Sequence, residues 1–356
     1  MDSKSYKLFY FITGFAITFL VTKLVFVIFH FADDIVHLGR LFFSWLRPKQ
    51  EIGSAVHEKI NRLQFINQAG LLVSGFVFGS MIYGQIKGKY NFKVWRQNIP
   101  FPDLPEAFAG IKIVQLSDMH LGSFMDNSFD EVKEAIAKVN ELEPDYIFFT
   151  GDLVNNYAYE AEPWIEIIAS LKAKRGKYSI LGNHDYSDYV PWKNPEEKKA
   201  NIERLFEIHE EMGFKLLKNE TAILEKDGQE IALVGVENWG KGFHQYGDLN
   251  KALEGLSETA FKILLSHDPT HFDQAVMGKT NIALTMSGHT HGMQMGIEIP
   301  SLGIKISPIQ LRYKRWAGLY DINGQYLYVN RGFGFLGFPG RVGIYPEITL
   351  LELQKA

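Results

Sequence analysis

The stretch SGHTHGMQMG, from Ser287 to Gly296, places two histidines one residue apart among glycines. It directly follows NIALTM, a short apolar run of the kind that forms a buried β-strand. Histidines in a turn rich in Gly and Thr are often ordinary surface residues, so the stretch alone leaves two interpretations open. It is either a surface turn or a ligand site at the mouth of a strand, and the rest of the chain decides between them.

Five apolar runs end on carboxylate, amide or imidazole side chains, usually beside Gly or Ser. The runs are IKIVQLSDMH, DYIFFTGD, KYSILGNHD, FKILLSHD and NIALTMSGHTH. In an open α/β sheet the carboxyl ends of the strands converge on one crevice, where ligands bind. The shared ending therefore favours a single site over five unrelated turns. Its candidate residues are Asp118, His120, Asp152, Asn183, His184, Asp185, His267, His289 and His291.

These side chains suit two divalent metal ions such as Mn, Fe or Zn. A lone carboxylate such as Asp152 can bridge two ions through its two oxygens. Two cations ~3.5–4 Å apart would clamp a phosphoryl group and lower the pKa of a bound water. The chain contains no cysteine, which excludes disulfides and Cys-ligated zinc or iron–sulfur sites. The pattern therefore predicts a binuclear centre with oxygen and nitrogen ligands.

The composition limits the remaining classes of function. The chain has 356 residues, 46% of them hydrophobic, and a net charge of −4 from 37 basic and 41 acidic residues. No basic face suggests nucleic acid, so we expect no nucleic-acid partner. After Pro105 the apolar runs alternate with helical patterns at 129–142 and 194–212, and two further strand-like runs follow at 324–332 and 346–353. This alternation predicts an α/β domain.

The N-terminal segment differs in character and predicts a membrane anchor over residues 1–86. Its spans are expected at about 8–31 and 65–84, since about 20 apolar residues cross a bilayer. A signal peptide is the rival interpretation of the first span, but the apolar run is too long and no cleavage site follows. For the second span the alternative is a buried or re-entrant helix. The stretch 33–49 between them has the pattern of an interfacial amphipathic helix. Residues 87–110 are expected to form a linker and an entry strand, and residues 111–356 the α/β domain.

The motifs D-x-H, GD, GNHD, SHD and GHTHG, in this order, resemble those of the calcineurin-like metallophosphoesterase superfamily. The closing YVNRGFG…PGRVGIYPEITLLEL resembles a bacterial, membrane-linked subgroup related to YkuE and YaeI. The resemblance implies a four-layer α/β/β/α sandwich, preceded here by transmembrane helices. It also implies two metal sites that share Asp152. One would use Asp118, His120, Asp152 and His291, and the other would use Asp152, Asn183, His267 and His289.

The resemblance further implies a catalytic His184 above the metals, where it stabilises phosphoryl charge or protonates the leaving oxygen. Asp185 is expected to support this loop. The stretch GDLVNN departs from the GDxVDRG of protein Ser/Thr phosphatases, since Asn155 replaces a carboxylate and no Arg follows. This departure argues against a protein phosphatase and leaves open what orients His184.

Four further residues have two open interpretations each. Arg331 and Arg341 are expected either to contact substrate phosphate or to form structural ion pairs. Trp192 and Trp239 lie in aromatic loops that form either a substrate wall or a lid over packed helices.

The sequence thus predicts a membrane-anchored, two-metal phosphoesterase that hydrolyses a phosphodiester or pyrophosphate bond. Its substrate is expected to be lipid-linked, such as UDP-2,3-diacylglucosamine. The alternatives are a phosphodiesterase for soluble substrates that is merely localised by its anchor, and a non-catalytic scaffold of the same fold. The expected location is the bacterial cytoplasmic membrane, and the even spread of basic residues predicts no sidedness.

Overall fold

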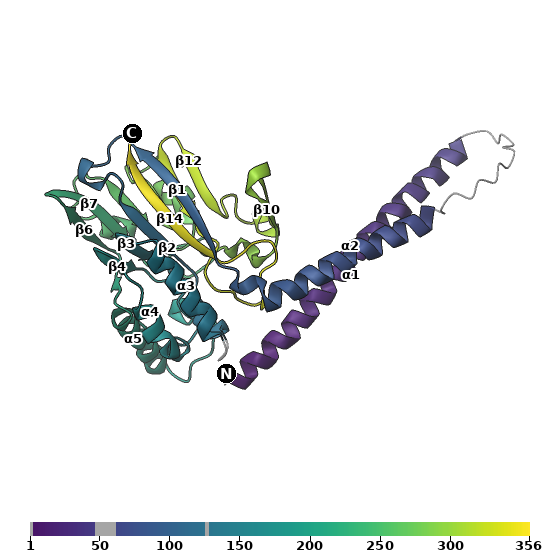
Figure 1. Ribbon diagram of the computed structural model, residues 1–356, viewed down its shortest axis with the longest axis horizontal. Helices are drawn as coiled ribbons and strands as arrows, with labels where there is room; N and C mark the ends of the chain where they lie inside the picture. Colours follow the sequence, from purple (N-terminus) through teal and green to yellow (C-terminus); the bar gives the residue numbers. More distant parts are fainter. Residues whose placement is uncertain (1–2, 47–61, 125–127) are drawn as a thin grey trace.

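The computed structural model describes residues 3–46, 62–124 and 128–356. It consists of a long helical hairpin followed by an α/β domain built on two sheets (Figure 1). Of the predicted anchor, residues 1–2 and 47–61 lie outside the described residues.

The first sheet has the strand order β1-β14-β2-β3-β4-β5. Its strands β2, β3 and β4 run parallel to one another, so their carboxyl ends lie at the same edge, whereas β14 pairs antiparallel with β2. The strands are β1 (Lys93–Phe101), β2 (Lys112–Leu116), β3 (Tyr146–Phe149), β4 (Gly176–Ser179), β5 (Lys215–Leu216) and β14 (Glu347–Lys355).

The second sheet has the order β12-β13-β9-β8-β7-β6. Strands β7, β8, β9 and β13 are parallel, and the antiparallel β6 and β12 form its edges. A separate antiparallel pair, β10 and β11, lies beside the hairpin (Figure 1). The strands are β6 (Glu220–Lys226), β7 (Gln229–Gly235), β8 (Lys262–Leu265), β9 (Leu284–Ser287), β10 (Ile297–Ile299), β11 (Ile304–Ile306), β12 (Gly318–Ile322) and β13 (Gln325–Val329).

The alternation of side chains along each strand builds a core on both faces of each sheet. In β3, Tyr146 and Phe148 join the core between the sheets, while Ile147 and Phe149 join the core under the helices. In β8, Ile263 and Leu265 face the first sheet, while Leu264 packs with the outer helical layer. Burying one such side chain contributes about 1.5–3 kcal/mol. The predicted α/β/β/α sandwich is therefore confirmed, and both predicted helical patterns form helices.

Helices α3 (Phe129–Glu141), α4 (Ile165–Ala169) and α5 (Pro195–Glu211) cover the first sheet, and α6 (Leu249–Leu253) packs on the second. Helix α3 buries Val132, Ala135, Ile136 and Val139, which is the i, i+3, i+4, i+7 spacing of one helical face. Helix α5 begins at Asn194, whose side chain accepts a hydrogen bond from the Glu197 amide.

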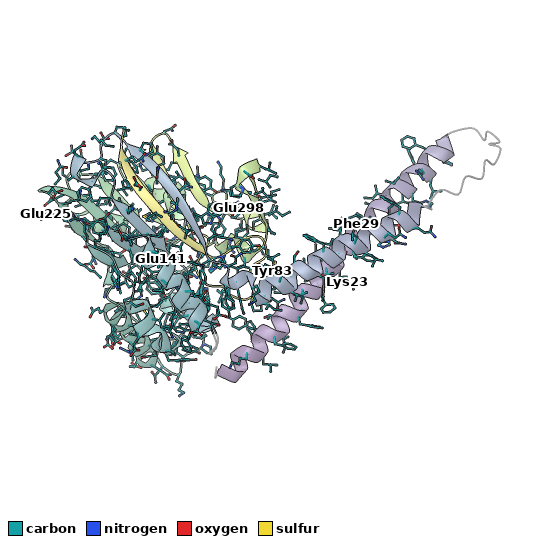
Figure 2. All side chains as sticks on the ribbon, in the orientation of Figure 1. Lys23, Phe29, Tyr83, Glu141, Glu225 and Glu298 are labelled. Atoms are coloured by element: carbon teal, nitrogen blue, oxygen red, sulfur yellow. The ribbon has the colours of Figure 1, made fainter. Side chains whose placement is uncertain are left out.

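The hairpin consists of α1 (Ser3–Leu46) and α2 (Arg62–Ile86). Both helices are long and apolar enough to cross a membrane, over Lys7–Phe43 and Gln64–Ile86. Figure 2 shows Lys23 and Phe29 on the part that projects from the domain, and Tyr83 where the hairpin meets it. Apolar side chains on this projecting part are largely exposed, for example Leu72 and Phe76 at 76% each. A bilayer would remove such surface from water.

The hairpin differs in two details from the predicted pair of short spans joined by an interfacial helix. Helix α1 continues without a break through 33–46, so this stretch forms no separate interfacial helix, and 47–49 lies outside the described residues. The helices approach closely at Gly70, where an added Cβ would lie 3.3 Å from the side chain of Phe29. Gly75 and Gly79 have no neighbour within 4 Å of such a Cβ and serve no close contact.

Candidate metal centre

The predicted ligands come from five loops that follow β2, β3, β4, β8 and β9. Five of these predicted ligands have backbone in the left-handed region, which non-glycine residues rarely adopt. Such residues cost about 1–3 kcal/mol each and cluster at functional sites. Their φ angles are 52° for Asp118, 45° for His120, 59° for Asp152, 69° for His289 and 51° for His291.

Glycines permit the loops to approach one another. A Cβ on Gly182 would lie 2.2 Å from Asp152 Oδ1, and one on Gly288 would lie 2.2 Å from Asp118 Oδ2. No side chain fits at such distances. The glycine beside each motif is therefore required because another loop's carboxylate occupies the space.

The first group of ligands, which we call the first triad, consists of Asp118, His120 and His291. Their ligand atoms all lie within 4.8 Å of one another, and all three residues are buried. His291 Nε2 is 3.1 Å from Asp118 Oδ1 and 3.1 Å from His120 Nε2. The three donors thus converge on one small volume.

The second triad consists of Asp152, His267 and His289, again with ligand atoms within 4.8 Å of one another. His267 Nε2 is 3.2 Å from both Asp152 Oδ2 and His289 Nδ1. His267 Nδ1 donates to the Thr150 carbonyl at 2.7 Å, so Nε2 is the ring atom that faces the triad and would bind a metal once it has lost its proton. His289 is only partly buried, which makes this triad the more open of the two.

Asp152 joins the two triads through one oxygen. Its Oδ2 lies 3.2 Å from His267 Nε2 and 3.5 Å from His120 Nε2. Its Oδ1 accepts a hydrogen bond from the His184 amide at 2.8 Å. One carboxylate oxygen thus faces a histidine of each triad, and the bridging role of Asp152 stays a prediction.

The charge pattern of the centre favours a cation. Burial by itself raises the pKa of Asp118, but His291 and His267 hold it well below its usual range. Burial likewise raises the pKa of Asp152, and His267 and His184 oppose it so that the group stays ionised. Burial lowers the pKa of His267, but Asp152 and then Asp118 raise it to about 10. Two ionised, buried carboxylates therefore attract positive charge to this volume.

Asn183 is the remaining predicted ligand of the second site. Its Nδ2 donates to Tyr189 Oη at 2.8 Å, while its buried Oδ1 has no hydrogen-bond partner. An unpaired buried amide oxygen has the chemistry of a ligand for a divalent ion. The residues present therefore fit two such ions.

The loop that carries His184 is fixed by Asn155 and Asp185. His184 Nδ1 donates to the Asn155 carbonyl at 2.8 Å, which leaves Nε2 for a substrate oxygen. The main chain of Asn155 thus orients His184, a question that the sequence left open. Asp185 accepts hydrogen bonds from the amides of Gly182, Asp152 and Leu153, each at 2.8 Å. Burial and then the charge of Asp152 raise the pKa of Asp185 to about 7.

Two residues that sequence reasoning missed lie behind His289. Tyr313 Oη is 2.8 Å from His289 Nε2, and Asp268 Oδ2 is 3.5 Å from the same atom. Such partners fix the tautomer and orientation of a ligating histidine. Asp268 directly follows His267 in SHD and could have been suspected from that position, whereas no sequence signal marks Tyr313.

The two arginines separate into different environments. Arg331 is 2% exposed, contacts Glu298 and Glu347 at 2.5 and 2.6 Å and lies 4.1 Å above the Trp95 ring. It is therefore a structural ion pair. Arg341 is fully buried, donates to the Gly334 carbonyl and places Nη2 3.3 Å from His291 Nδ1. It lies behind a ligand and not at the surface of the site.

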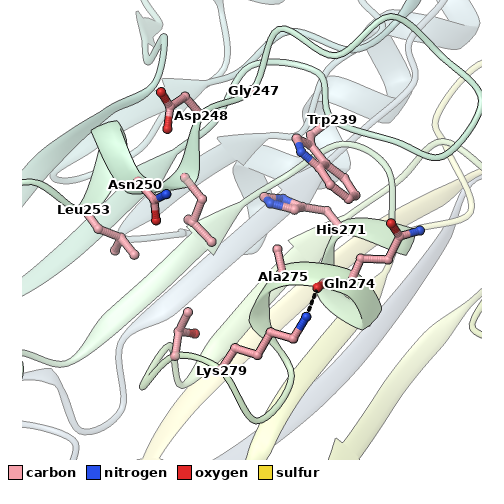
Figure 3. Close-up of a pocket in the computed structure, with 11 residues that line it drawn as sticks. Trp239, Gly247, Asp248, Asn250, Leu253, His271, Gln274, Ala275 and Lys279 are labelled. Carbon is pink, nitrogen blue, oxygen red and sulfur yellow. Dashed lines mark hydrogen bonds between the residues drawn. The ribbon is translucent and has the colours of Figure 1, made fainter.

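The two tryptophans do not line the centre. Trp192 donates from Nε1 to the Ser187 carbonyl and meets Tyr157 edge to face. Trp239 stacks on His271 with ring centroids 4.5 Å apart, in a separate cavity of about 570 Å³ (Figure 3). The aromatic residues beside the centre are instead Tyr189, Phe243 and Tyr313, which contact His184 or His289. The substrate-wall interpretation of the two tryptophans is therefore wrong.

Both the α/β domain and the N-terminal hairpin match known protein families. Residues 111–293 match the family described as Calcineurin-like phosphoesterase, and residues 1–89 match the one described as Probable Calcineurin-like phosphoesterase, transmembrane domain. The chain is 31% identical over 310 residues to the uncharacterized metallophosphoesterase YkuE of Bacillus subtilis, covering 84% of this chain and 99% of that protein.

Two other relatives differ in how much they share. A transmembrane protein with metallophosphoesterase domain from Danio rerio is 31% identical over 283 residues, 77% of this chain. The matched part is 60% of that protein, so the chain spans less than two thirds of its length. The UDP-2,3-diacylglucosamine pyrophosphatase LpxG of Chlamydia trachomatis is 29% identical over 283 residues, covering 65% of this chain and 81% of that protein.

The sandwich fold, the converging ligand triads and these matches agree. The chain belongs to the calcineurin-like metallophosphoesterase family and is membrane-associated through an N-terminal transmembrane domain.

Proposed function

We propose that the chain hydrolyses a phosphodiester or pyrophosphate bond of a lipid-linked substrate at a centre of two divalent metal ions. The observation that carries the two-metal part is the single oxygen, Asp152 Oδ2, that faces a histidine of each triad. The first ion would be held by Asp118, His120, Asp152 and His291, and the second by Asp152, Asn183, His267 and His289. Two such ions polarise phosphoryl oxygens and lower the pKa of a bound water.

His184 is the proposed catalytic residue. Its amide donates to Asp152 and its Nδ1 to the Asn155 carbonyl, so the imidazole is fixed beside the His120 ring at a centroid distance of 5.0 Å. A proton on Nε2 would stabilise the charge that develops on the phosphoryl group or pass to the leaving oxygen. General acid catalysis of this kind contributes roughly 10²–10⁴-fold in rate.

A lipid-linked substrate is supported by a cavity between the hairpin and the domain. The cavity measures about 890 Å³ and its surface is mainly apolar. Two of its lining residues, Met295 and Val342, are close in sequence to His291 of the first triad and to Arg341. The relative LpxG, whose name states a diacylated pyrophosphate substrate, favours the same class. A cavity with walls from candidate membrane spans is a suitable place for an acyl chain.

The test compares two substrates with the full chain in detergent micelles, after metal loading with Mn²⁺, Fe²⁺ or Zn²⁺. One substrate is a soluble chromogenic phosphodiester and the other is UDP-2,3-diacylglucosamine in mixed micelles. Gly79 lines the cavity, and a Cβ there meets nothing within 4 Å, so Gly79→Leu fills space without a backbone clash. Gly75→Leu is the matched control, because Gly75 is equally open but does not line the cavity.

We expect Gly79→Leu to lower the lipid rate about tenfold, the effect of roughly 1.4 kcal/mol in transition-state binding. The rate on the soluble diester should not change, and Gly75→Leu should affect neither. Hydrolysis of the soluble diester alone would identify an enzyme for soluble substrates that the hairpin merely localises. No hydrolysis with any metal would identify a scaffold.

A further inference from the structure

The first turns of α1 are docked into the catalytic domain. Tyr10 is 3% exposed, whereas its neighbours Phe9 and Phe11 are 43% and 71% exposed. The Tyr10 ring packs edge to face on Phe335, and its hydroxyl lies 2.6 Å from Ser123 Oγ. Three residues later, Thr13 Oγ1 lies 3.2 Å from the Gly337 carbonyl oxygen. The start of the membrane hairpin is therefore a packed part of the domain.

A chain of buried polar groups leads from Tyr10 to a metal ligand. Ser123 Oγ accepts a hydrogen bond from Asn155 Nδ2 at 3.1 Å, and Asn155 Oδ1 lies 3.1 Å from His120 Nδ1. All four residues, Tyr10, Ser123, Asn155 and His120, are buried. The connection from the hairpin to His120 is thus direct and shielded from water.

The chemistry of an amide explains what this connection does. An Asn side chain donates from one end and accepts at the other, so its orientation is set by its partners. Ser123 Oγ lies 3.1 Å from Asn155 Nδ2 and 3.2 Å from Asn155 Oδ1, so it alone does not orient the amide. Tyr10 Oη lies 3.5 Å from Nδ2 and offers it a second acceptor, which favours the orientation with Oδ1 toward His120. His120 then carries its proton on Nδ1 and presents the lone pair of Nε2 to the first triad.

The second helix of the hairpin and the residues just after it contact Arg341, which lies behind the same triad. The Arg341 amide donates to the Gly84 carbonyl at 3.1 Å, and a Cβ on Gly88 would lie 2.3 Å from the Arg341 carbonyl oxygen. The side chain of Arg341 in turn lies 3.3 Å from His291 Nδ1. Both histidines of the first triad are therefore backed by residues that the hairpin contacts.

We propose that the membrane hairpin contributes to metal binding at the centre, because Tyr10 positions His120 through Ser123 and Asn155. The proposal rests on the two-metal centre proposed above but not on the identity of the substrate. It assigns Tyr10 as a positioning residue of the first metal site. The second triad is supported instead by Tyr313 and Asp268 of the domain, so the affinity of the second site is independent of the hairpin.

The experiment measures Mn²⁺ affinity in the full chain by calorimetry, with free Mn²⁺ followed by electron paramagnetic resonance. Tyr10→Phe keeps the packing on Phe335 and removes only the hydroxyl. Ser123→Ala interrupts the same connection from the domain side. Tyr83→Phe is the matched control, since it removes a hydroxyl from the same hairpin at an exposed position. Each change is also made in the background of His289→Asn, in which only the first site is intact. It is made again in the background of His291→Asn, in which only the second site is intact.

Removing the direct partner of a ligand costs about 10–100-fold in metal affinity, and Tyr10 is two residues further from the metal. We therefore expect Tyr10→Phe and Ser123→Ala to weaken the first site by roughly three- to tenfold, with the second site and Tyr83→Phe unchanged. Thermal melting of the metal-free variants reports their folding. Unchanged affinity at the first site, or equal weakening of both sites, would overturn the proposal. A starting protein that binds fewer than two Mn²⁺ would instead overturn the two-metal centre.

Discussion

The two triads contain the same chemistry, one carboxylate and two imidazoles each, but different parts of the molecule support them. The first triad is wholly buried and is backed by Asn155 and Arg341, which connect it to the hairpin. The second is partly open at His289 and is backed by Tyr313 and Asp268. In the proposed centre, one half would therefore be coupled to the membrane segment and the other half supported by the domain alone.

The largest effect is expected from replacing Asp152, the residue that joins the two triads. Asp152→Asn keeps a side chain that tolerates the left-handed backbone at φ 59° but removes the bridging charge. We expect loss of both metal equivalents and a fall in kcat of roughly 10³-fold or more, as for residues that act as a unit. Elemental analysis and steady-state rates measure this, and the exposed Asp103→Asn is the control. Retention of one full equivalent would mean that the triads do not depend on a common carboxylate.

The next largest effect is expected from His184→Gln, which should affect the rate of hydrolysis but not metal binding at either triad. His184→Gln should lower kcat by about 10²-fold, the scale of acid–base catalysis, with two metals retained. The reason is that His184 contributes only its amide to Asp152, while its ring donates to the Asn155 carbonyl and packs edge to face beside His120. His244→Gln, at an exposed position, is the matched control. If activity falls only in proportion to lost metal, His184 is a ligand or a structural support.

The two halves should also differ in how pH affects metal binding. The pKa of His267 is raised to about 10, so below that pH a metal ion must displace its proton. Affinity at the second site should therefore rise about tenfold for each pH unit between 6 and 9, since one proton is released. Burial keeps the pKa of His120 well below its usual range, so this ligand of the first site releases no proton.

Mn²⁺ titrations of the His291→Asn and His289→Asn variants at several pH values measure the two dependences separately. A steep rise with pH for the second site and a shallower one for the first would sharpen the comparison. Equal slopes would show that the carboxylates do not distinguish His267 from the other imidazoles.

The smallest expected effect concerns the support of the second triad. Tyr313→Phe removes the hydroxyl 2.8 Å from His289 Nε2 and should weaken the second site about tenfold, the lower end for such partners. The first site serves as the internal control in the same titration. Weakening of the first site as well would indicate that the two halves share their support.

The sequence predicted the strands and the converging ligands well, because each is a local pattern. Apolar runs such as IKIVQL and YIFF form strands that end where Asp118 and Asp152 stand, and parallel strand ends meet at one edge. The roles of these residues as metal ligands stay predictions. The edge strands β6 and β12 and the pair β10–β11 were not predicted, since many of their side chains are exposed or half-exposed and they lack a continuous apolar run.

What the sequence could not predict depends on tertiary packing. Tyr10 and Ser123 are separated by more than a hundred residues, and only the docking of α1 brings their hydroxyls together. Tyr313 reaches His289 from a loop with no motif. Trp239 was placed near the site because its loop follows a strand end, but the loop turns its ring onto His271 instead. Loop direction is a property of the folded chain, not of residue type.

The most direct test of the two-metal centre counts the ions that each half retains. The full chain, His291→Asn and His289→Asn are loaded with Mn²⁺, freed of excess metal and analysed for bound Mn²⁺ and activity. We expect two equivalents in the starting protein, one in each variant, and hydrolysis only where both are present. Two equivalents in both variants, or full activity of the starting protein after chelation, would contradict it.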